Sequence, residues 1–522
     1  MTLAGPPPDH DPALDPEACY QALVARDARF DGSFFVGVST TGIYCRPVCR
    51  ARTPGRDRCS FFPHAALAEQ AGFRACFRCR PERAPGQASV DAVSQLVASA
   101  VRRIEEGALN DGSVEDLARA LGTSSRHLRR AMTTELGLGP VELAGSRRVA
   151  LARELLRSTT LPVTDVAFAS GFSSIRRFND AYRASQKMTP SDVRRPGAPA
   201  SDGILEGGLR IELDVRTPYD LDAAFAFLRA RSVAGSEAFV DGAWVRAATI
   251  GGRTGLVAAT ASASRAGIVV EVSPSLAPSL MNVASRMRRV FDTDADPSVI
   301  DAHLARDPAL ARLVAARPGL RVMGAFEPFE WAVRAVIGQQ ISVAGARTIA
   351  ARLVARLGTP VESALPGAPT HAWPAPSVLA AAPEADLIAL GLSGARARTL
   401  RGLARAVADG RLVLDGRVDP ATLMATLRAL PGVGPWTAEY IAMRALHWPD
   451  AFPAGDLGLR KALGGITEAA CERHAERWRP WRAYAAAHLW LGTAEATTRA
   501  PMATRPVKRK TPTKMARKSK KP

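Results

Sequence analysis

Two close pairs of cysteines have the spacing of metal ligands. Cys45 and Cys49 have three residues between them, Cys76 and Cys79 have two, and 26 residues separate the pairs. Two such pairs predict a tetrahedral zinc site with four thiolate ligands. The alternative is a set of ordinary core thiols, which the many arginines beside these cysteines disfavour. Cys59 lies between the pairs without a close partner, so we do not count it as a ligand.

A glycine-rich turn, L-P-G-V-G, precedes a second candidate site. Gly432 and Gly434 end any helix before this point, and a helix that begins near Pro435 would direct its free amides outward. Since neither glycine has a Cβ atom, a phosphate could approach the backbone closely. An ordinary structural turn is the alternative.

Two aromatic residues and one acid follow this turn. Trp436 and Tyr440 are four residues apart and therefore share one face of a helix, while Asp456 stands at the start of the next expected helix. Core packing is the ordinary role of such aromatic residues, and a helix N-cap is the ordinary role of such an aspartate. A backbone clamp for DNA, two aromatic rings and one carboxylate, all close in sequence, suggest chemistry on a base.

The composition favours a polyanionic partner. The chain has 522 residues, enough for three or four domains, and a net charge of +19 at pH 7. Such a charge favours nucleic acid over a membrane, and no run of residues is long and apolar enough for a membrane span. Residues 1–15 are expected to form a disordered leader. Residues 501–522 are expected to form a disordered basic tail, with at most a weak grip on DNA.

The middle of the chain, residues 90–195, is predicted to be helical. The pattern of helix, glycine turn and helix occurs twice, with turns at Gly122 and Gly171 and a longer helix between the two units. The second helix of each unit would enter a major groove of DNA, although about half of its polar residues would contact phosphate or solvent instead. The arginines that these helices present are Arg126, Arg129, Arg130, Arg176 and Arg177. A plain helical bundle is the alternative.

The rest of the chain divides into two parts. Residues 205–290 combine two strand patterns, GLRIELDV and GIVVEVS, with a helix, which predicts an α+β subdomain with an antiparallel sheet. Residues 297–493 have a helical pattern with proline-rich breaks. The expected fold class is multidomain, mainly α with α+β parts.

The segments TTGIYCRPVCRAR and FFPHAALAEQAGFRACFRCRPE resemble the N-terminal domain of the Ada family, across residues 16–85. That family repairs methylphosphotriesters in DNA, and the first cysteine of its C-R-P-x-C segment both binds zinc and accepts the methyl group. The resemblance implies this role for Cys45. A zinc-bound thiolate stays nucleophilic at neutral pH. Methylation would change the charge of the four-thiolate zinc centre from −2 to −1 and weaken its repulsion of DNA, in a reaction that consumes the protein.

The two helix-turn-helix units, with the ending F-x-x-A-Y-x-x-S-x-x-M-T-P-S, resemble the AraC-type regulators. Residues 205–493 resemble the AlkA-type 3-methyladenine DNA glycosylases of the helix-hairpin-helix superfamily. The segments that carry this resemblance are RPGLRVMGAFEPFEWAVRAVIGQQISVAGART, LPGVGPWTAEYIAMRAL, FPAGDLGLRKAL and RPWRAYAAAHLW. The resemblance implies that Asp456 is the catalytic aspartate and that Trp436, Tyr440 and Trp490 line the base pocket.

The same resemblance implies that the hairpin of Gly432 and Gly434 grips the DNA backbone, where carbonyl oxygens could hold a monovalent cation. At two positions this sequence has a different residue from its relatives. Trp436 stands where bifunctional relatives have a Schiff-base lysine, which implies hydrolysis without strand cleavage. Gln340 stands where AlkA relatives often have an apolar wedge that fills the gap left by the flipped base. No P-C-H-R-type segment is present, so we do not expect repair of O6-methylguanine by this chain.

The sequence therefore predicts a fusion with a zinc methyl-acceptor domain at 16–85 and an AraC-type domain at 90–195. An AlkA-like N-terminal subdomain at 205–290 and a helix-hairpin-helix glycosylase domain at 297–493 would follow. Such a protein would excise alkylated bases and switch on transcription after methyl transfer. The alternative is a methylation-sensing regulator with a weak or inactive glycosylase half. The expected partners are double-stranded DNA and RNA polymerase, and the expected state is a cytoplasmic, nucleoid-associated monomer.

Overall fold

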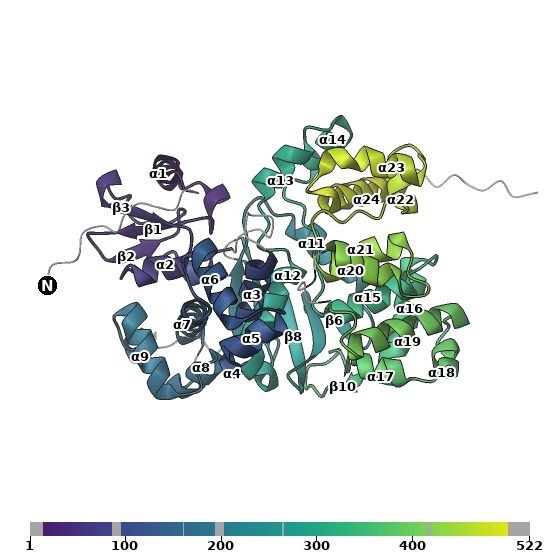
Figure 1. Cartoon of the computed structure of the whole chain (residues 1–522), viewed down its shortest axis with the longest axis horizontal. Coiled ribbons are helices and arrows are strands. Elements are labelled where there is room, and N and C mark those ends of the chain that lie inside the picture. The colour runs from purple at the N-terminus through teal and green to yellow at the C-terminus, as the bar shows by residue number, and fades with distance from the viewer. Residues whose placement is uncertain are drawn as a thin grey trace, which may run out of the picture.

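The computed structural model describes residues 14–85, 95–159, 161–193, 203–263, 266–414, 418 and 420–499. These residues form, in chain order, a small domain with a four-stranded sheet, a helical domain, a five-stranded sheet with helices, and a large helical domain (Figure 1). The predicted fold class, multidomain and mainly α with α+β parts, is confirmed. Most of the expected leader, the segments 86–94 and 194–202 between domains, and the basic tail lie outside the described residues.

The N-terminal domain begins with helix α1 (Pro16–Ala25), whose first turn is capped by the carboxylate of Asp15. Its sheet has the order β3-β1-β2-β4, and helix α2 (Ala65–Gln70) packs against it. The strands are β1 (Phe35–Val38), β2 (Ile43–Cys45), β3 (Cys59–Phe62) and β4 (Arg74–Ala75). Because β2 and β4 are parallel and paired, the residues that end and follow them lie side by side.

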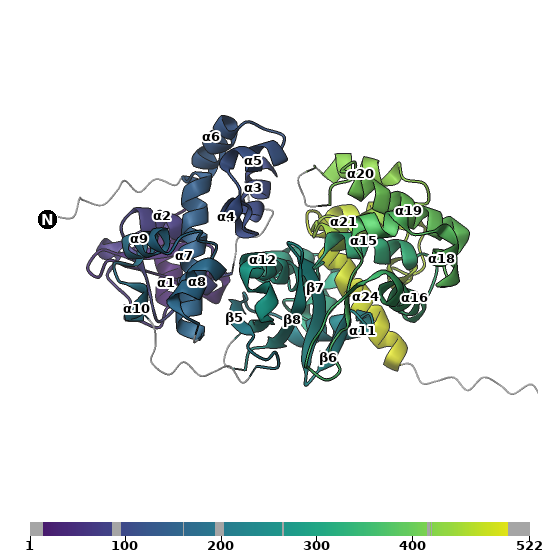
Figure 2. The same ribbon diagram turned by 90° about the horizontal axis from the view of Figure 1, so that it is seen from below.

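The second domain contains both predicted helix-turn-helix units. Its helices are α3 (Gln95–Glu105), α4 (Ala108–Asp111), α5 (Val114–Ala120), α6 (Ser125–Leu136), α7 (Pro140–Ser158), α8 (Val163–Ala169), α9 (Ile175–Gln186) and α10 (Pro190–Val193). Ser113 and Asp116 cap α5 reciprocally. Gly122 and Gly171 have φ angles of +68° and +85°, which glycine adopts without strain, so each turn reverses the chain between two short helices. The long helix α7 joins the two units (Figure 2).

A five-stranded antiparallel sheet in the order β5-β9-β8-β7-β6 follows. Its strands are β5 (Leu209–Asp214), β6 (Glu237–Val240), β7 (Ala243–Ile250), β8 (Arg253–Ala261) and β9 (Gly267–Val272). Helix α11 (Leu221–Arg231) contacts β7, and helix α12 (Leu280–Val290) contacts β5 and β9. The two predicted strand segments correspond to β5 and β9.

The C-terminal domain is helical apart from a two-stranded ribbon of β10 (Thr359–Pro360) and β11 (His371–Ala372). Helix α15 (Pro328–Ile337) is its central element, since it contacts helices α16, α19 and α21 and buries most of its side chains. The other helices are α13 (Pro297–Leu304), α14 (Pro308–Ala316), α16 (Val343–Leu357), α17 (Pro376–Ala381), α18 (Glu384–Ala389), α19 (Gly394–Ala408), α20 (Pro420–Arg428), α21 (Pro435–Ala445), α22 (Leu457–Ala462), α23 (Glu468–Ala475) and α24 (Arg482–Arg499). None of the described helices is long and apolar enough to cross a membrane.

The second helix-turn-helix unit and the five-stranded sheet share one hydrophobic core. Phe178 and Tyr182 of α9 belong to the same buried cluster as Ile211 of β5 and Val270 of β9. Helix α7 also contacts β5 directly. The N-terminal and C-terminal halves of the chain are therefore packed together as parts of one body, although a linker outside the described residues joins them.

Buried ion pairs reinforce this contact between the halves. Arg46, the residue after Cys45, donates to the carboxylates of Asp31 and Asp214, and the three side chains are only 6–7% exposed. Arg83 likewise donates to Glu154 of α7 at 2.6 Å and to Glu212 of β5 at 2.8 Å. Because these charges are removed from water, each depends on its partner.

Replacing Asp214 with alanine is expected to lower the free energy of unfolding by about 3 kcal/mol, because Arg46 would stay buried with one carboxylate instead of two. Urea unfolding of the full chain, followed by circular dichroism, measures this. The control is Asp222→Ala, which removes an exposed carboxylate from α11 and should change stability by less than about 0.5 kcal/mol. Equal losses in the two variants would contradict the expectation.

Candidate metal centre and active-site pocket

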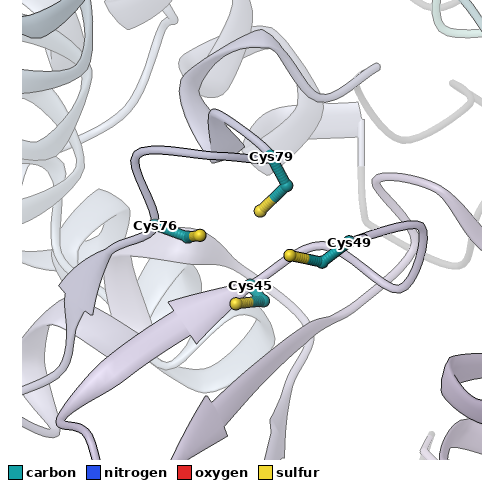
Figure 3. A group of neighbouring side chains, drawn as sticks. All are labelled: Cys45, Cys49, Cys76 and Cys79. Carbon is teal, nitrogen blue, oxygen red and sulfur yellow. The ribbon is translucent and has the colours of Figure 1, made fainter. Parts of the chain in front are cut away.

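The four paired cysteines converge on one point. Their Sγ atoms all lie within 4.8 Å of one another, and the four side chains come from the end of β2, the segment after it and the segment after β4 (Figure 3). Four sulfurs around a tetrahedral Zn²⁺ with Zn–S bonds of about 2.3 Å would be roughly 3.8 Å apart, so the cluster matches this ion. The predicted zinc site with Cys45, Cys49, Cys76 and Cys79 therefore has the donor set and the geometry that Zn²⁺ requires.

The sheet explains why these cysteines meet. Cys45 ends β2 and Cys76 follows β4, and these two strands pair in parallel. Two backbone amides donate to sulfur: Arg46 N–H to Cys79 Sγ and Arg78 N–H to Cys76 Sγ, both at 3.4 Å. Such amide donors stabilise the negative charge of metal-bound thiolates.

The remaining cysteines lie outside this cluster. Cys59 is in β3 and donates to the carbonyl of Gly55 at 3.3 Å, and burial raises the pKa of its thiol. Burial also raises the pKa of Cys19 and of Cys471 to about 11. The cluster contains none of these three residues, which agrees with leaving Cys59 out of the predicted ligand set.

A cavity of about 370 Å³ lies beside Cys45 and is lined by three arginines, Arg52, Arg74 and Arg78. Nη1 of Arg74 is buried and has no hydrogen-bond partner among the described residues. The guanidinium of Arg74 also lies 5.4 Å from the ring centroid of Phe77, another residue of the cavity wall. The cavity therefore places positive charge next to the cysteine cluster, which suits an anionic ligand.

A second cavity, of about 440 Å³, is lined by the three aromatic residues that the sequence assigned to the base pocket and by Asp456, the expected catalytic residue. Trp436 and Tyr440 come from α21, Trp490 from α24, and Asp456 from the residue before α22. The rings of Trp436 and Tyr440 are stacked, with centroids 5.2 Å apart and planes 7° apart. The ring of Trp490 stands edge-on to Tyr440 at 6.3 Å.

Three N–H groups hold the carboxylate of Asp456. Oδ1 accepts from the indole of Trp490 at 2.9 Å and from the amide of Leu459 at 3.0 Å, and Oδ2 accepts from the indole of Trp436 at 3.1 Å. Asp456 is thus the N-cap of α22 and also part of the cavity wall. The N-cap role of Asp456 is thus observed, and its position in the cavity wall is compatible with the catalytic role, which stays a prediction.

The two glycines of the hairpin differ in the space around their Cα atoms. Gly432 has a φ of +84°, and a Cβ there would lie 2.0 Å from Oγ1 of Thr399 in α19, so this glycine is required by packing. A Cβ at Gly434 would meet nothing within 4 Å, and Gly434 is exposed as the N-cap of α21. Only Gly434 therefore leaves open space in which another molecule could approach the backbone.

Gln340, the predicted wedge, is exposed at the turn between α15 and α16 and has a left-handed φ of +55°. The preceding Gln339 donates from Nε2 to the carbonyl of Gly432 and to Oγ1 of Thr437, both at 2.9 Å. These bonds hold the turn against the glycine hairpin. The exposed Gln340 directly follows this anchored residue, and its role as a wedge stays a prediction.

The five predicted DNA-reading arginines are all exposed, and they come from the second helix of each helix-turn-helix unit. Arg129 also forms an exposed ion pair with Glu115 of α5 at 3.3 Å. Their positions fit contact with DNA, and their roles remain predictions. The helices α6 and α9 carry Arg126, Arg129 and Arg130, and Arg176 and Arg177, respectively.

The cavity around Asp456 is also lined by residues that the sequence analysis did not identify. Trp331 and Arg334 lie three residues apart on α15, within a segment that carried the resemblance to glycosylases, so their spacing could have drawn attention to them. Arg231 ends α11 and Arg347 lies on α16, and no local pattern marks either one. Only the folded chain brings them to Asp456.

Four family models match successive parts of the chain. They are the metal binding domain of Ada (residues 18–82), a helix-turn-helix domain (117–196), the AlkA N-terminal domain (210–327) and the HhH-GPD superfamily of base excision DNA repair proteins (333–480). Fold and sites thus define the class: a base excision DNA repair protein joined to a metal-binding regulator. This confirms both resemblances, to the Ada and AraC-type regulators and to the AlkA-type glycosylases.

The probable bifunctional transcriptional activator/DNA repair enzyme AlkA of Mycobacterium tuberculosis H37Rv is 43% identical over 482 residues, which cover 91% of this chain and 96% of that protein. The chain therefore belongs to this family of bifunctional transcriptional activator/DNA repair enzymes. DNA-3-methyladenine glycosylase 2 of Escherichia coli K12 is 37% identical over 53% of the chain and 95% of its own length. Ada of the same organism is 34% identical over 32% of the chain and 47% of its own length. These findings do not favour the alternative of a regulator with an inactive glycosylase half.

Replacing Cys76 with serine is expected to abolish zinc binding, since three thiolates and a hydroxyl bind Zn²⁺ far more weakly than four thiolates do. Wild-type protein should contain one zinc ion per chain, measured by atomic emission on protein purified without chelator. Cys59→Ser is the matched control in the same domain and should keep its zinc. Loss of zinc from both variants would show that the domain had unfolded, and retention in both would contradict the assignment.

Proposed function

We propose that this chain hydrolyses the N-glycosidic bond of alkylated bases of the 3-methyladenine type in double-stranded DNA. The observation that carries this proposal is the carboxylate of Asp456, oriented by the indoles of Trp436 and Trp490 in the wall of a cavity that can hold one base. An N-alkylated purine is positively charged and already a good leaving group. The protein therefore needs to extract the base and stabilise the sugar, and it needs little general acid catalysis.

Each residue of the pocket has a part in the proposed reaction. The hairpin at Gly434 would hold the DNA backbone, and Gln340 would fill the gap that the damaged nucleotide leaves when it rotates out of the stack. The rings of Trp436 and Tyr440 would hold the cationic base. As the C1′–N bond breaks, its electron pair goes to the base, and Asp456 stabilises the positive charge on the sugar. Water then adds to C1′ and releases its proton to solvent or to Asp456.

We propose hydrolysis alone, without cleavage of the DNA strand. The residues that line the cavity include no lysine, and Trp436 occupies the hairpin position at which bifunctional relatives have one. Strand cleavage of that kind begins with attack of an amine on C1′ to form a Schiff base. A water molecule is the nucleophile that remains, which supports a glycosylase of the monofunctional type.

Asp456→Asn is expected to slow base release by roughly 100-fold or more while DNA binding is retained, because the amide removes the negative charge that stabilises the sugar. Release of 7-methylguanine and 3-methyladenine from methylated duplex DNA, measured by chromatography, tests this. Asp409→Asn, which changes an exposed carboxylate at the end of α19, is the control and should act like wild type. Undiminished base release by Asp456→Asn would refute the proposed role.

We also propose that the N-terminal half is a methyl sensor. The sulfur of Cys45 would attack the methyl carbon of a DNA methylphosphotriester; an S–C bond forms, the C–O bond breaks, and its electron pair leaves on the phosphate as an ordinary phosphodiester. Bound zinc keeps the sulfur as a thiolate. The arginines of the adjoining cavity, and the unused donor of Arg74 in particular, support recognition of the phosphate. The thioether product is stable, so each chain would react once.

Loss of one negative charge near the bound DNA would then strengthen promoter binding by the two helix-turn-helix units. We propose that the methylated chain activates transcription through RNA polymerase and acts as a monomer at the bacterial nucleoid. Its promoter-bound helices would be α6 and α9, whose exposed arginines supply the positive charge.

Cys45→Ala is expected to abolish the increase in promoter occupancy that follows exposure of cells to a methylating agent, because no methyl group can be accepted. For the wild type we expect an increase of roughly tenfold, typical of a coupled binding equilibrium. Chromatin immunoprecipitation before and after treatment measures this. Cys59→Ala, the control, should respond like the wild type. A normal response of Cys45→Ala would exclude this cysteine as the sensor.

A further inference from the structure

Two guanidiniums lie over one aromatic ring at the border between the N-terminal domain and the helical domain. The ring is that of Phe77, the residue directly after Cys76, and its centroid is 5.4 Å from Cζ of Arg74 and 5.2 Å from Cζ of Arg157. Arg74 belongs to β4, whereas Arg157 belongs to the last turn of α7. The ring of Phe77 therefore connects the domain of the cysteine cluster with the helix that joins both helix-turn-helix units.

The same ring lines the cavity of about 370 Å³ beside the cysteine cluster, as does Arg74. Nη1 of Arg74 is buried and has no hydrogen-bond partner among the described residues. Arg46, which also lies next to the cluster, differs in this respect because the carboxylates of Asp31 and Asp214 bind its guanidinium. Two acids thus balance the charge of Arg46, whereas the guanidinium of Arg74 lies over an uncharged ring.

An aromatic ring holds a guanidinium in a different way from a carboxylate. A carboxylate occupies N–H donors and cancels the positive charge, so an arginine bound in that way has little left to offer a second anion. A ring attracts the cation to the negative charge of its π face and leaves the N–H groups free. The contact with Phe77 therefore restricts where the guanidinium of Arg74 lies, while its charge stays available to a ligand in the cavity.

The ring of Phe77 is itself held on both sides of the domain border. Its backbone follows a cysteine of the cluster, and the next amide, of Arg78, donates to Sγ of Cys76 at 3.4 Å. Its side chain packs against the hydrophobic core that the second helix-turn-helix unit shares with the five-stranded sheet. A ring that is anchored in this way can keep a long, flexible arginine side chain in one orientation.

The proposed methyl transfer creates negative charge in this cavity. The phosphate of a methylphosphotriester is uncharged, and the phosphodiester that remains after loss of the methyl group is an anion. The charge grows as the C–O bond breaks and its electron pair moves to the phosphate oxygen, while the S–C bond to Cys45 forms. A guanidinium whose position is set beforehand stabilises this growing charge without reorganisation.

We propose that Phe77 is a positioning residue for methyl transfer, which holds the guanidinium of Arg74 where negative charge develops on the phosphate. This inference rests on the proposed methyl sensor and deepens it. Arg74 acts on the phosphate, and Phe77 acts through Arg74. Because Arg157 of α7 lies over the same ring, the helix between the two DNA-binding units supports the geometry of the reaction centre.

The test measures methyl transfer from a duplex oligonucleotide with a single methylphosphotriester to the zinc-loaded full chain, by mass spectrometry of the intact protein with DNA in excess. Phe77→Leu is expected to lower the maximal rate constant roughly tenfold, while the DNA concentration at half-maximal rate stays within about twofold of wild type, because the charge develops only in the transition state. Phe77→Tyr keeps the ring and should restore most of the rate. Arg74→Gln should be at least as slow as Phe77→Leu, and the double variant should be no slower than Arg74→Gln.

Phe61→Leu is the matched control. Phe61 lies in β3 of the same domain, outside the wall of this cavity, and its ring centroid is 5.2 Å from Cζ of Arg56. This variant also loses an aromatic ring beneath a guanidinium, but it should accept the methyl group at the wild-type rate. The zinc content of each variant, measured on the same samples, should equal that of the wild type.

Loss of zinc from Phe77→Leu, slow transfer by Phe77→Tyr, or additive effects in the double variant would assign the ring a structural role and overturn the inference. A higher half-saturating DNA concentration with an unchanged maximal rate constant would overturn it as well. The proposed methyl sensor has a separate criterion, since it fails if the wild type gains no methyl group. The two failures are therefore distinguishable in one experiment.

Discussion

The three hydrogen bonds that orient the carboxylate of Asp456 are the constraint on which the pocket depends. Its three N–H donors come from α21, α22 and α24, so each is supplied by a different helix. These helices must pack correctly before the carboxylate acquires its orientation. Gln339 extends the same arrangement to the glycine hairpin through Gly432 and Thr437. Hydrogen bonds therefore connect Asp456 with two of the aromatic rings, and other hydrogen bonds connect the glycine hairpin with the turn that precedes Gln340.

The parts of the molecule that depend on local spacing were predictable from the sequence. The geometry of several short segments follows from helix periodicity and turn chemistry. These segments contain the cysteine pairs, the helices on either side of Gly122 and Gly171, and the residues 436, 440 and 456. The sequence also predicted β5, an edge strand of the five-stranded sheet, and β9, the strand that pairs with it. Strand β7 was not foreseen because it is buried at nearly every position and so lacks alternation of apolar and polar residues.

Contacts between segments that are distant in the sequence could not be predicted from local patterns. Arg46 and Asp214 are 168 residues apart, and Arg231 reaches the pocket from a subdomain in which the sequence revealed no catalytic residue. Gly432 had an evident role as a helix breaker, but its close approach to Thr399 depends on how α19 packs. Burial of charge shows the same limit, because a guanidinium without a carboxylate partner looks like any surface arginine until the chain is folded.

The two cavities share no lining residue, although they belong to halves that are packed together through a common core. The two proposed chemistries differ in how often one molecule can perform them. In the proposed function Cys45 forms a thioether and cannot react again, whereas the pocket of Asp456 would be unchanged after each base that it releases. A population of these chains that has exhausted its capacity to sense damage would retain its full capacity to remove damaged bases, so past exposure would be recorded without loss of repair.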